Sequence, residues 1–167
     1  MGRTIKGVFL FLFLFAWLYL MHVLSTADGE ETLEQSMALA EKIADKFFGE
    51  YSDTFLEYLN NIIRKLAHVA IYLVLGFLVA AIWDFLLCNH LKVRWRALFS
   101  LITTSAIAFL DEYQKIPISG RHFDKEEVVL NAICAAAVVI CYFFIIYLIE
   151  AMHRRRQRKR EKKKKTA

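Results

Sequence analysis

One predicted helix carries three polar side chains on a single face. Lys65, His68 and Tyr72 are spaced i, i+3 and i+7 in the segment RKLAHVAIYLVLG, and residues at this spacing share one face of a helix. An imidazole can act as a general acid or base near neutral pH, and a Lys side chain can bind a phosphate or carboxylate. This face therefore predicts either acid–base chemistry or the binding of an anion.

A second group of polar residues follows a later apolar run, in the segment FLDEYQKIPISGRHFDKEEVVLN. Asp111 and Glu112 stand where the run ends, and Pro117 stops a helix because it has no N–H to donate. A Ser-Gly turn then precedes Arg121. Because acidic residues at a helix C-terminus oppose the helix dipole, this pair predicts a specific cationic partner such as Lys65 or Arg121.

The last apolar run contributes Glu127 and Asn131, which are spaced i, i+4 and so share a helix face. A lone Asn in a membrane helix is typically a hydrogen-bonding contact between helices. Ionisable groups at membrane depth face the bundle interior and find partners there, so we expect one polar cluster in the outer leaflet. Its catalytic members, if the protein is an enzyme, would be His68, Asp111 and Glu112, and its ligand-binding members would be Lys65, Tyr72, Arg121, Glu127 and Asn131.

Other polar residues have simpler interpretations. Asp84 is predicted to pair with Arg94 or Arg96 near the inner end of its run. No metal-ligand spacing such as C-x-x-C or H-E-x-x-H occurs, so we expect no metal and no cofactor. The three cysteines do not make a disulfide framework and are expected to be apolar filling residues.

Four apolar runs must position these side chains, and they cover residues 7–24, 66–87, 97–110 and 128–149. The third run is the shortest, since a helix over 97–110 measures about 21 Å and the hydrocarbon core about 30 Å. Its helix must therefore extend through Trp95 on one side and to about Gln114 on the other, which places Asp111 and Glu112 below the lipid surface. A re-entrant segment is the alternative, but the charge distribution favours an even number of crossings.

Composition and charge agree with a membrane protein. The 167 residues are 57% apolar, above the usual range of soluble domains, which excludes a disordered chain and a disulfide-rich secreted module. Fifteen of the 22 Lys and Arg residues lie in three segments, before the first run, between the second and third, and after His153. Four spans place all three segments on one side, which the positive-inside rule assigns to the cytoplasm. Both termini are therefore predicted to be cytoplasmic, and the basic tail marks that side rather than a nucleic-acid partner.

The predicted fold is an all-α polytopic membrane helix bundle, with four transmembrane helices plus an outer amphipathic helix. Residues 1–27 form the first span, and 28–62 an acidic extracytoplasmic helix with an apolar stripe and a possible bend at Gly49 and Ser52. Residues 63–150 form a three-span core, and 151–167 a basic cytoplasmic tail. The outer helix is expected either to cap the bundle or to act as a lid over an outer pocket.

The first run could alternatively be a signal peptide, because Ser25-Thr26-Ala27 resembles a cleavage site, but its length favours a retained span.

These residues, in this order, resemble the VanZ-like family of bacterial membrane proteins, named for a teicoplanin-resistance accessory protein. The resemblance covers about residues 63–137 and rests on a K-x-x-H-x-x-x-Y stretch, an acidic pair, a Gly-Arg turn, a later acidic residue and an Asn. The chain departs from the family pattern at Lys115, where Gln is usual, at Glu127, where Asp is common, and at Cys134, where Gly is frequent. The resemblance implies a membrane topology and a cell-envelope context, but no reaction.

Three functions follow as hypotheses. The protein could bind a lipid-linked precursor or an amphiphilic antibiotic in the outer leaflet, or assist another membrane protein, with Lys65 and Arg121 holding a phosphate or carboxylate. It could instead be an intramembrane hydrolase or transferase acting on a phospho- or acyl-lipid, with His68 as the acid or base, oriented by Asp111 or Glu112. A transporter is less favoured, because four spans without an internal repeat leave little room for a path. Binding is favoured over catalysis because the sequence offers no strong nucleophile motif.

Overall fold

The computed structural model describes residues 2–27, 29–118 and 123–166. Within these ranges the regular elements are five helices and no strand, which confirms the all-α prediction. The helices are α1 (Gly2–Thr26), α2 (Gly29–Phe47), α3 (Asp53–Leu87), α4 (Val93–Tyr113) and α5 (Lys125–Thr166).

Four of these helices, α1, α3, α4 and α5, are long and apolar enough to cross a membrane. The predicted number of spans is therefore confirmed. The third span also extends as predicted, because α4 begins at Val93 and its C-cap residue is Gln114. Its 21 residues measure about 32 Å, enough to cross a hydrocarbon core of about 30 Å.

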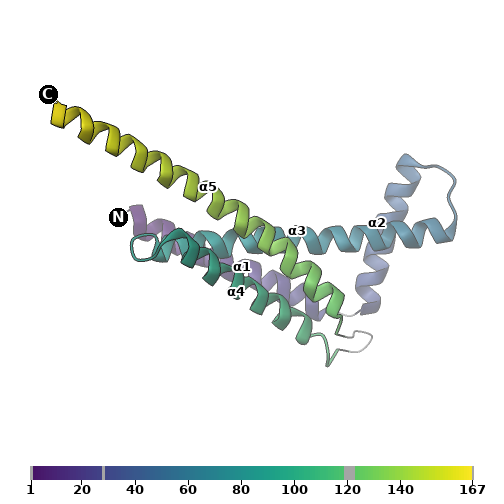
Figure 1. The fold of residues 1–167 in the computed structure, drawn as a ribbon. Coiled ribbons are helices and arrows are strands. Elements are labelled where there is room, and N and C mark those ends of the chain that lie inside the picture. The colour runs from purple at the N-terminus through teal and green to yellow at the C-terminus, as the bar shows by residue number, and fades with distance from the viewer. Residues whose placement is uncertain (1, 28, 119–122, 167) are drawn as a thin grey trace.

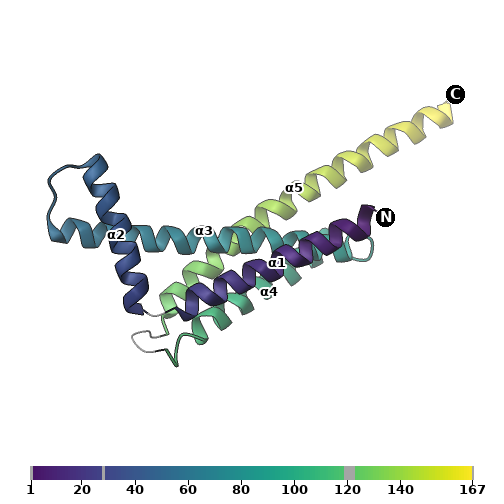
Figure 2. The same cartoon turned by 180° about the vertical axis from the view of Figure 1, so that it is seen from behind.

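The bundle has two distinct ends (Figures 1 and 2). The N-terminus of α1, the turn between α3 and α4, and the basic stretch of α5 lie toward one end, which we call the terminal end. The C-termini of α1 and α4 and the start of α5 lie together at the other, the distal end. An even number of crossings produces this arrangement.

Helices α3, α4 and α5 pack against one another, and α1 packs on α3 and α4. Helices α3 and α5 approach closely at Gly76, where a Cβ atom would meet the carbonyl oxygen of Ala135 at 2.6 Å. Tyr72, Leu75 and Val79 on α3 are buried beside this contact. Gly76 is thus a packing residue that brings the polar faces of α3 and α5 close together.

The predicted amphipathic helix is present as α2 but is shorter than the predicted range 28–62. Helix α2 ends at Phe47, and Gly49 then adopts a positive φ of 71°, which favours glycine. Ser52 caps the next helix by accepting a hydrogen bond from the Phe55 N–H at 3.3 Å. The predicted bend is therefore a break, and residues 53–62 are the first turns of α3 rather than the end of a separate helix.

Helix α3 has 35 residues and measures about 52 Å, so it extends well beyond a single membrane thickness. Its first turns project from the distal end, and α2 crosses them (Figures 1 and 2). Ala40 and Ala44 of α2 are fully buried, whereas Leu33, Phe47 and Tyr58 of the same predicted stripe are exposed. Three larger residues of the stripe, Met37, Phe55 and Ile62, are half-buried. The stripe therefore packs only in part on the rest of the protein.

Candidate ligand-binding site

Asp111, near the end of α4, joins three helices at the distal end. Its Oδ1 accepts a hydrogen bond from Ser25 Oγ of α1 at 2.6 Å, and its Oδ2 accepts one from Tyr72 Oη of α3 at 2.7 Å. Gln114 Nε2 also donates to Oδ1 at 2.9 Å. A buried carboxylate needs such donors because it has lost its hydration. The prediction that Asp111 or Glu112 is hydrogen-bonded inside the bundle is confirmed for Asp111.

Glu112 is paired with a cation that the sequence interpretation did not choose. Lys115 Nζ lies 2.7 Å from Glu112 Oε2 and 3.0 Å from Glu127 Oε2. Glu112 and Lys115 are both buried, whereas Glu127 is 39% exposed. The expected partners were Lys65, which makes no ion pair with Glu112, and Arg121, which lies outside the described residues. Lys115 reaches Glu112 because the chain turns directly after α4. Lys115 and Glu127 are also two of the three positions at which the chain departs from the pattern of the family that it resembles, and the ion pair joins them.

A cavity of about 160 Å³ lies among α1, α2, α3 and the end of α4. Its buried side is polar and includes Ser25, Tyr72 and Asp111, which bond to one another. Thr32 of α2 also lines the cavity, and its remaining side chains are apolar or basic and come from α1 and α3: Met21, Leu24, Arg64, Ala67, His68 and Ile71. The cavity thus combines an apolar wall with two nitrogen donors near its exposed part.

Arg64 is the functional candidate that sequence reasoning missed. It lines the cavity and is exposed, and no carboxylate in the described part of the chain pairs with it. Lys65, the predicted ligand-binding residue, is also exposed but is not among the cavity residues. Arg64 and His68 are spaced i, i+4, which places them on one helix face just as the i, i+3 spacing does for Lys65 and His68. The spacing alone therefore predicted Arg64 as well as Lys65.

The remaining predicted residues are distributed as follows. His68 lines the cavity and is half-buried, and within the described residues it makes no hydrogen bond to Asp111 or Glu112. Asn131 is fully buried on α5, and neither its Oδ1 nor its Nδ2 has a hydrogen-bond partner among the described residues. Arg121 lies outside the described residues. The structure thus brings Tyr72, His68 and Asp111 to one cavity and places Glu112 and Glu127 in the adjoining ion-pair cluster.

Family membership is established by a match that covers most of the chain rather than a single motif. The model of the VanZ/LLP1 family matches residues 9–147, which include parts of all four candidate spans. The chain belongs to the VanZ/LLP1 family. It is therefore a multi-pass membrane protein of that family, and the match extends beyond residues 63–137 on both sides. No curated protein and no solved structure matches the chain.

The extent of the VanZ/LLP1 match bears on the site. It includes α1 from residue 9 onward, and so includes Ser25, which donates to Asp111. It ends before Glu150 and the basic stretch of α5. The distal cavity is therefore built entirely from residues inside the family match, whereas the terminal end is built partly from residues outside it.

Proposed function

We propose that this VanZ/LLP1 protein binds an amphiphile with an anionic head group in the outer leaflet, at the distal cavity. One observation carries the proposal. Arg64 and His68 line a cavity with an apolar wall, and within the described residues neither side chain has a carboxylate or hydrogen-bond partner. An Arg guanidinium recognises phosphate and carboxylate groups through paired N–H donors.

The other charges near the cavity are already engaged. Asp111 accepts hydrogen bonds from Ser25, Tyr72 and Gln114, and Lys115 holds both Glu112 and Glu127. Arg64 and His68 therefore supply the donors that remain for a ligand. Because they would neutralise an anion next to apolar side chains, the ligand should carry a charged group and a hydrocarbon part.

The size of the cavity indicates which part of the ligand enters it. Pockets that enclose a whole drug-sized molecule measure about 300–1,000 Å³, and this one measures about 160 Å³. It can hold a head group, while the chain extends over the exposed apolar surface of α1 into lipid. The lipid-linked wall precursors and lipoglycopeptide antibiotics suggested by the family context both have this form, with a phosphate or a carboxylate as the anion.

The side of the membrane follows from charge. Fifteen of the 22 Lys and Arg residues belong to segments at the terminal end, and the positive-inside rule assigns that end to the cytoplasm. The distal cavity would then open toward the outer leaflet. This orientation supports a ligand of the cell envelope rather than a cytoplasmic one.

The geometry supports binding over hydrolysis or group transfer. A catalytic His68 would need an orienting carboxylate and a nucleophile or water within reach. In the described part of the chain, the hydroxyls of Ser25 and Tyr72 donate to Asp111, and neither is bonded to His68. The enzyme hypothesis therefore has no specific observation in its favour.

A binding titration with a matched control tests the proposal. The protein is placed in phosphatidylcholine nanodiscs and titrated with a short-chain polyprenyl pyrophosphate and, separately, with teicoplanin. Arg64→Gln removes about 1.4 kcal/mol or more of charge-assisted hydrogen bonding and should weaken binding of at least one probe about tenfold or more. His68→Ala should weaken binding of the same probe. Lys65→Gln removes the same charge from the neighbouring position and should change little.

Equal affinities of wild type, Arg64→Gln and Lys65→Gln for both probes would contradict the proposal, and so would a failure of the wild type to bind either of them.

A further inference from the structure

A second cavity lies at the terminal end, far from the distal site. It measures about 530 Å³ and is formed by the α3–α4 turn, the start of α4 and the last apolar turns of α5. This volume lies within the range of small-molecule sites. The charged side chains that line it are Lys92, Arg94, Arg96, Glu150 and Arg154.

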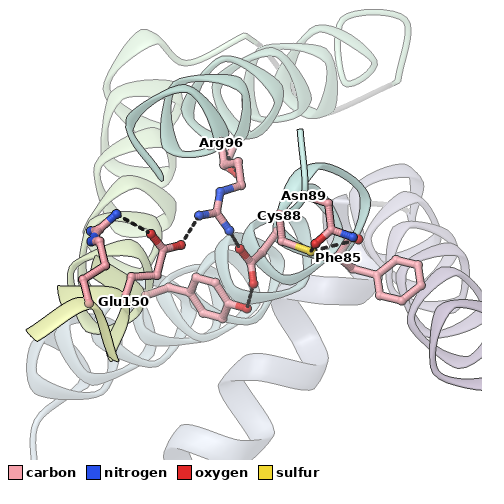
Figure 3. A network of polar contacts seen from close by, with 9 residues as sticks. Phe85, Cys88, Asn89, Arg96 and Glu150 are labelled. Carbon is pink, nitrogen blue, oxygen red and sulfur yellow. Dashed lines mark hydrogen bonds and ion pairs between the residues drawn. The ribbon is translucent and has the colours of Figure 1, made fainter. Parts of the chain in front are cut away.

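Arg96 holds this end of the bundle together. It is 2% exposed, and its guanidinium bonds Asp84 of α3 and Glu150 of α5 (Figure 3). Tyr142 Oη also donates to Asp84, at 3.4 Å. The predicted pairing of Asp84 with Arg96 is confirmed, and the network extends it to α5. Because a buried cation must keep its partners, Arg96 fixes the start of α4 against α3 and α5.

The positive charge of the cavity exceeds what its carboxylates neutralise. Asp84 and Glu150 pair with Arg96, and Glu150 also lies 3.6 Å from Arg154. Lys92 and Arg94 have no carboxylate partner within the described residues, although Arg94 lies over the ring of Trp95. The rigid Arg96 network thus presents two uncompensated cations at the cavity.

The backbone adds to this preference for an anion. Lys92 is the N-cap residue of α4, and its side chain makes no capping hydrogen bond. Lys92, Val93 and Arg94 all line the cavity, so the positive end of the α4 dipole faces the same space. The Nε of Arg96 is also buried, and no described residue accepts a hydrogen bond from it.

We propose that this terminal-end cavity is a second binding site of the protein, and that it takes the phosphate group of a phosphate ester. Lys92 and Arg94 contact the phosphate, and Arg96 positions them. The ligand is either the head group of an anionic phospholipid or a soluble phosphate ester, since both present the same group. The site is separate from the distal cavity and does not depend on the function proposed for it.

The native Cys88 provides a direct probe, because it is exposed and lines the cavity. In a Cys134→Ala/Cys141→Ala protein, Cys88 is the only thiol, and its rate of alkylation by a neutral maleimide reports access to the cavity. The protein is reconstituted in nanodiscs of phosphatidylcholine, of equal parts phosphatidylcholine and phosphatidylglycerol, and of phosphatidylcholine with soluble glycerol phosphate. A ligand present at about ten times its Kd should slow alkylation about tenfold.

Two paired substitutions distinguish a site from a general effect of surface charge. Lys92→Gln/Arg94→Gln removes two cavity cations and should abolish the protection. Arg155→Gln/Arg156→Gln removes two exposed cations that do not line the cavity and should leave the protection intact. A change in local pH at an anionic membrane would affect both variants alike, so the difference between them measures the site.

Each outcome decides the proposal. Protection only by phosphatidylglycerol, lost in Lys92→Gln/Arg94→Gln, assigns a phospholipid head group, and protection by glycerol phosphate assigns a soluble ester. Equal rates in all three conditions overturn the proposal, as does protection that is the same in both paired variants.

Discussion

Lys115 offers the sharpest test of the distal cluster, because it is the only cation bonded to Glu112 among the described residues. Glu112 is 1% exposed, so Lys115→Met leaves a buried carboxylate without its partner. Removing one member of a buried ion pair costs about 3–5 kcal/mol. Glu127, the other partner of Lys115, is 39% exposed and can be solvated, so the cost comes mainly from Glu112.

The assay is thermal unfolding of the protein in nanodiscs or mild detergent. For a chain of this size, 1 kcal/mol corresponds to about 2–4 °C, so Lys115→Met should lower the Tm by about 6–20 °C. Glu112→Gln should lower the Tm less than Lys115→Met does, because Lys115 keeps its ion pair with Glu127. The double variant Glu112→Gln/Lys115→Met has no buried charge left at this position and should recover much of the loss.

The order of the Tm values of the three variants is the decisive result. A Tm for Lys115→Met equal to that of the wild type would show that Glu112 is neutral or solvated in the membrane protein. A double variant no more stable than Lys115→Met would show that Lys115 contributes packing rather than charge. Either result would refute the ion-pair account of the distal cluster.

Three further predictions concern the frame around the site. Tyr72→Phe removes one of the two hydroxyl donors to the buried aspartate and should lower stability by about 1.5–3 kcal/mol, measured by the same unfolding assay. Gly76→Ala places a Cβ 2.6 Å from the carbonyl oxygen of Ala135, so α3 and α5 must separate, at a cost of about 1–3 kcal/mol in that assay; unchanged stability would disprove the close contact. A reporter active only outside the cytoplasm should be inactive when fused after Thr166 and active when inserted near Gly29, and the opposite pattern would move the distal cavity to the cytoplasmic leaflet.

The spans were predictable because they follow from length and hydropathy. The 14-residue third run was too short to cross a membrane, and this shortfall alone predicted that α4 reaches Gln114 and buries Asp111 and Glu112. The pairing of Asp84 with Arg96 was predictable because both residues lie close to one short turn between α3 and α4.

Other features depend on tertiary arrangement that periodicity does not encode. Arg64 and Lys65 are adjacent cations, both compatible with the His68 face, and only the packing of α1 and α2 on α3 decides which one lines the cavity. Lys115 lies beyond the helix, in a turn whose direction the sequence leaves open. The continuity of α3 from Asp53 was hidden because its first turns continue the apolar stripe of the outer helix and were assigned to that helix.

Photo-crosslinking at the distal cavity tests the central claim most directly. A polyprenyl pyrophosphate analogue with a diazirine next to its head group is activated on the wild-type protein in nanodiscs, and the labelled peptides are identified by mass spectrometry. The account predicts labels on Met21 or Leu24 of α1 and on Ala67 or Ile71 of α3, lost in Arg64→Gln and retained in Lys65→Gln. Labels confined to the lipid-facing side chains of α5, or unaffected by Arg64→Gln, would contradict it.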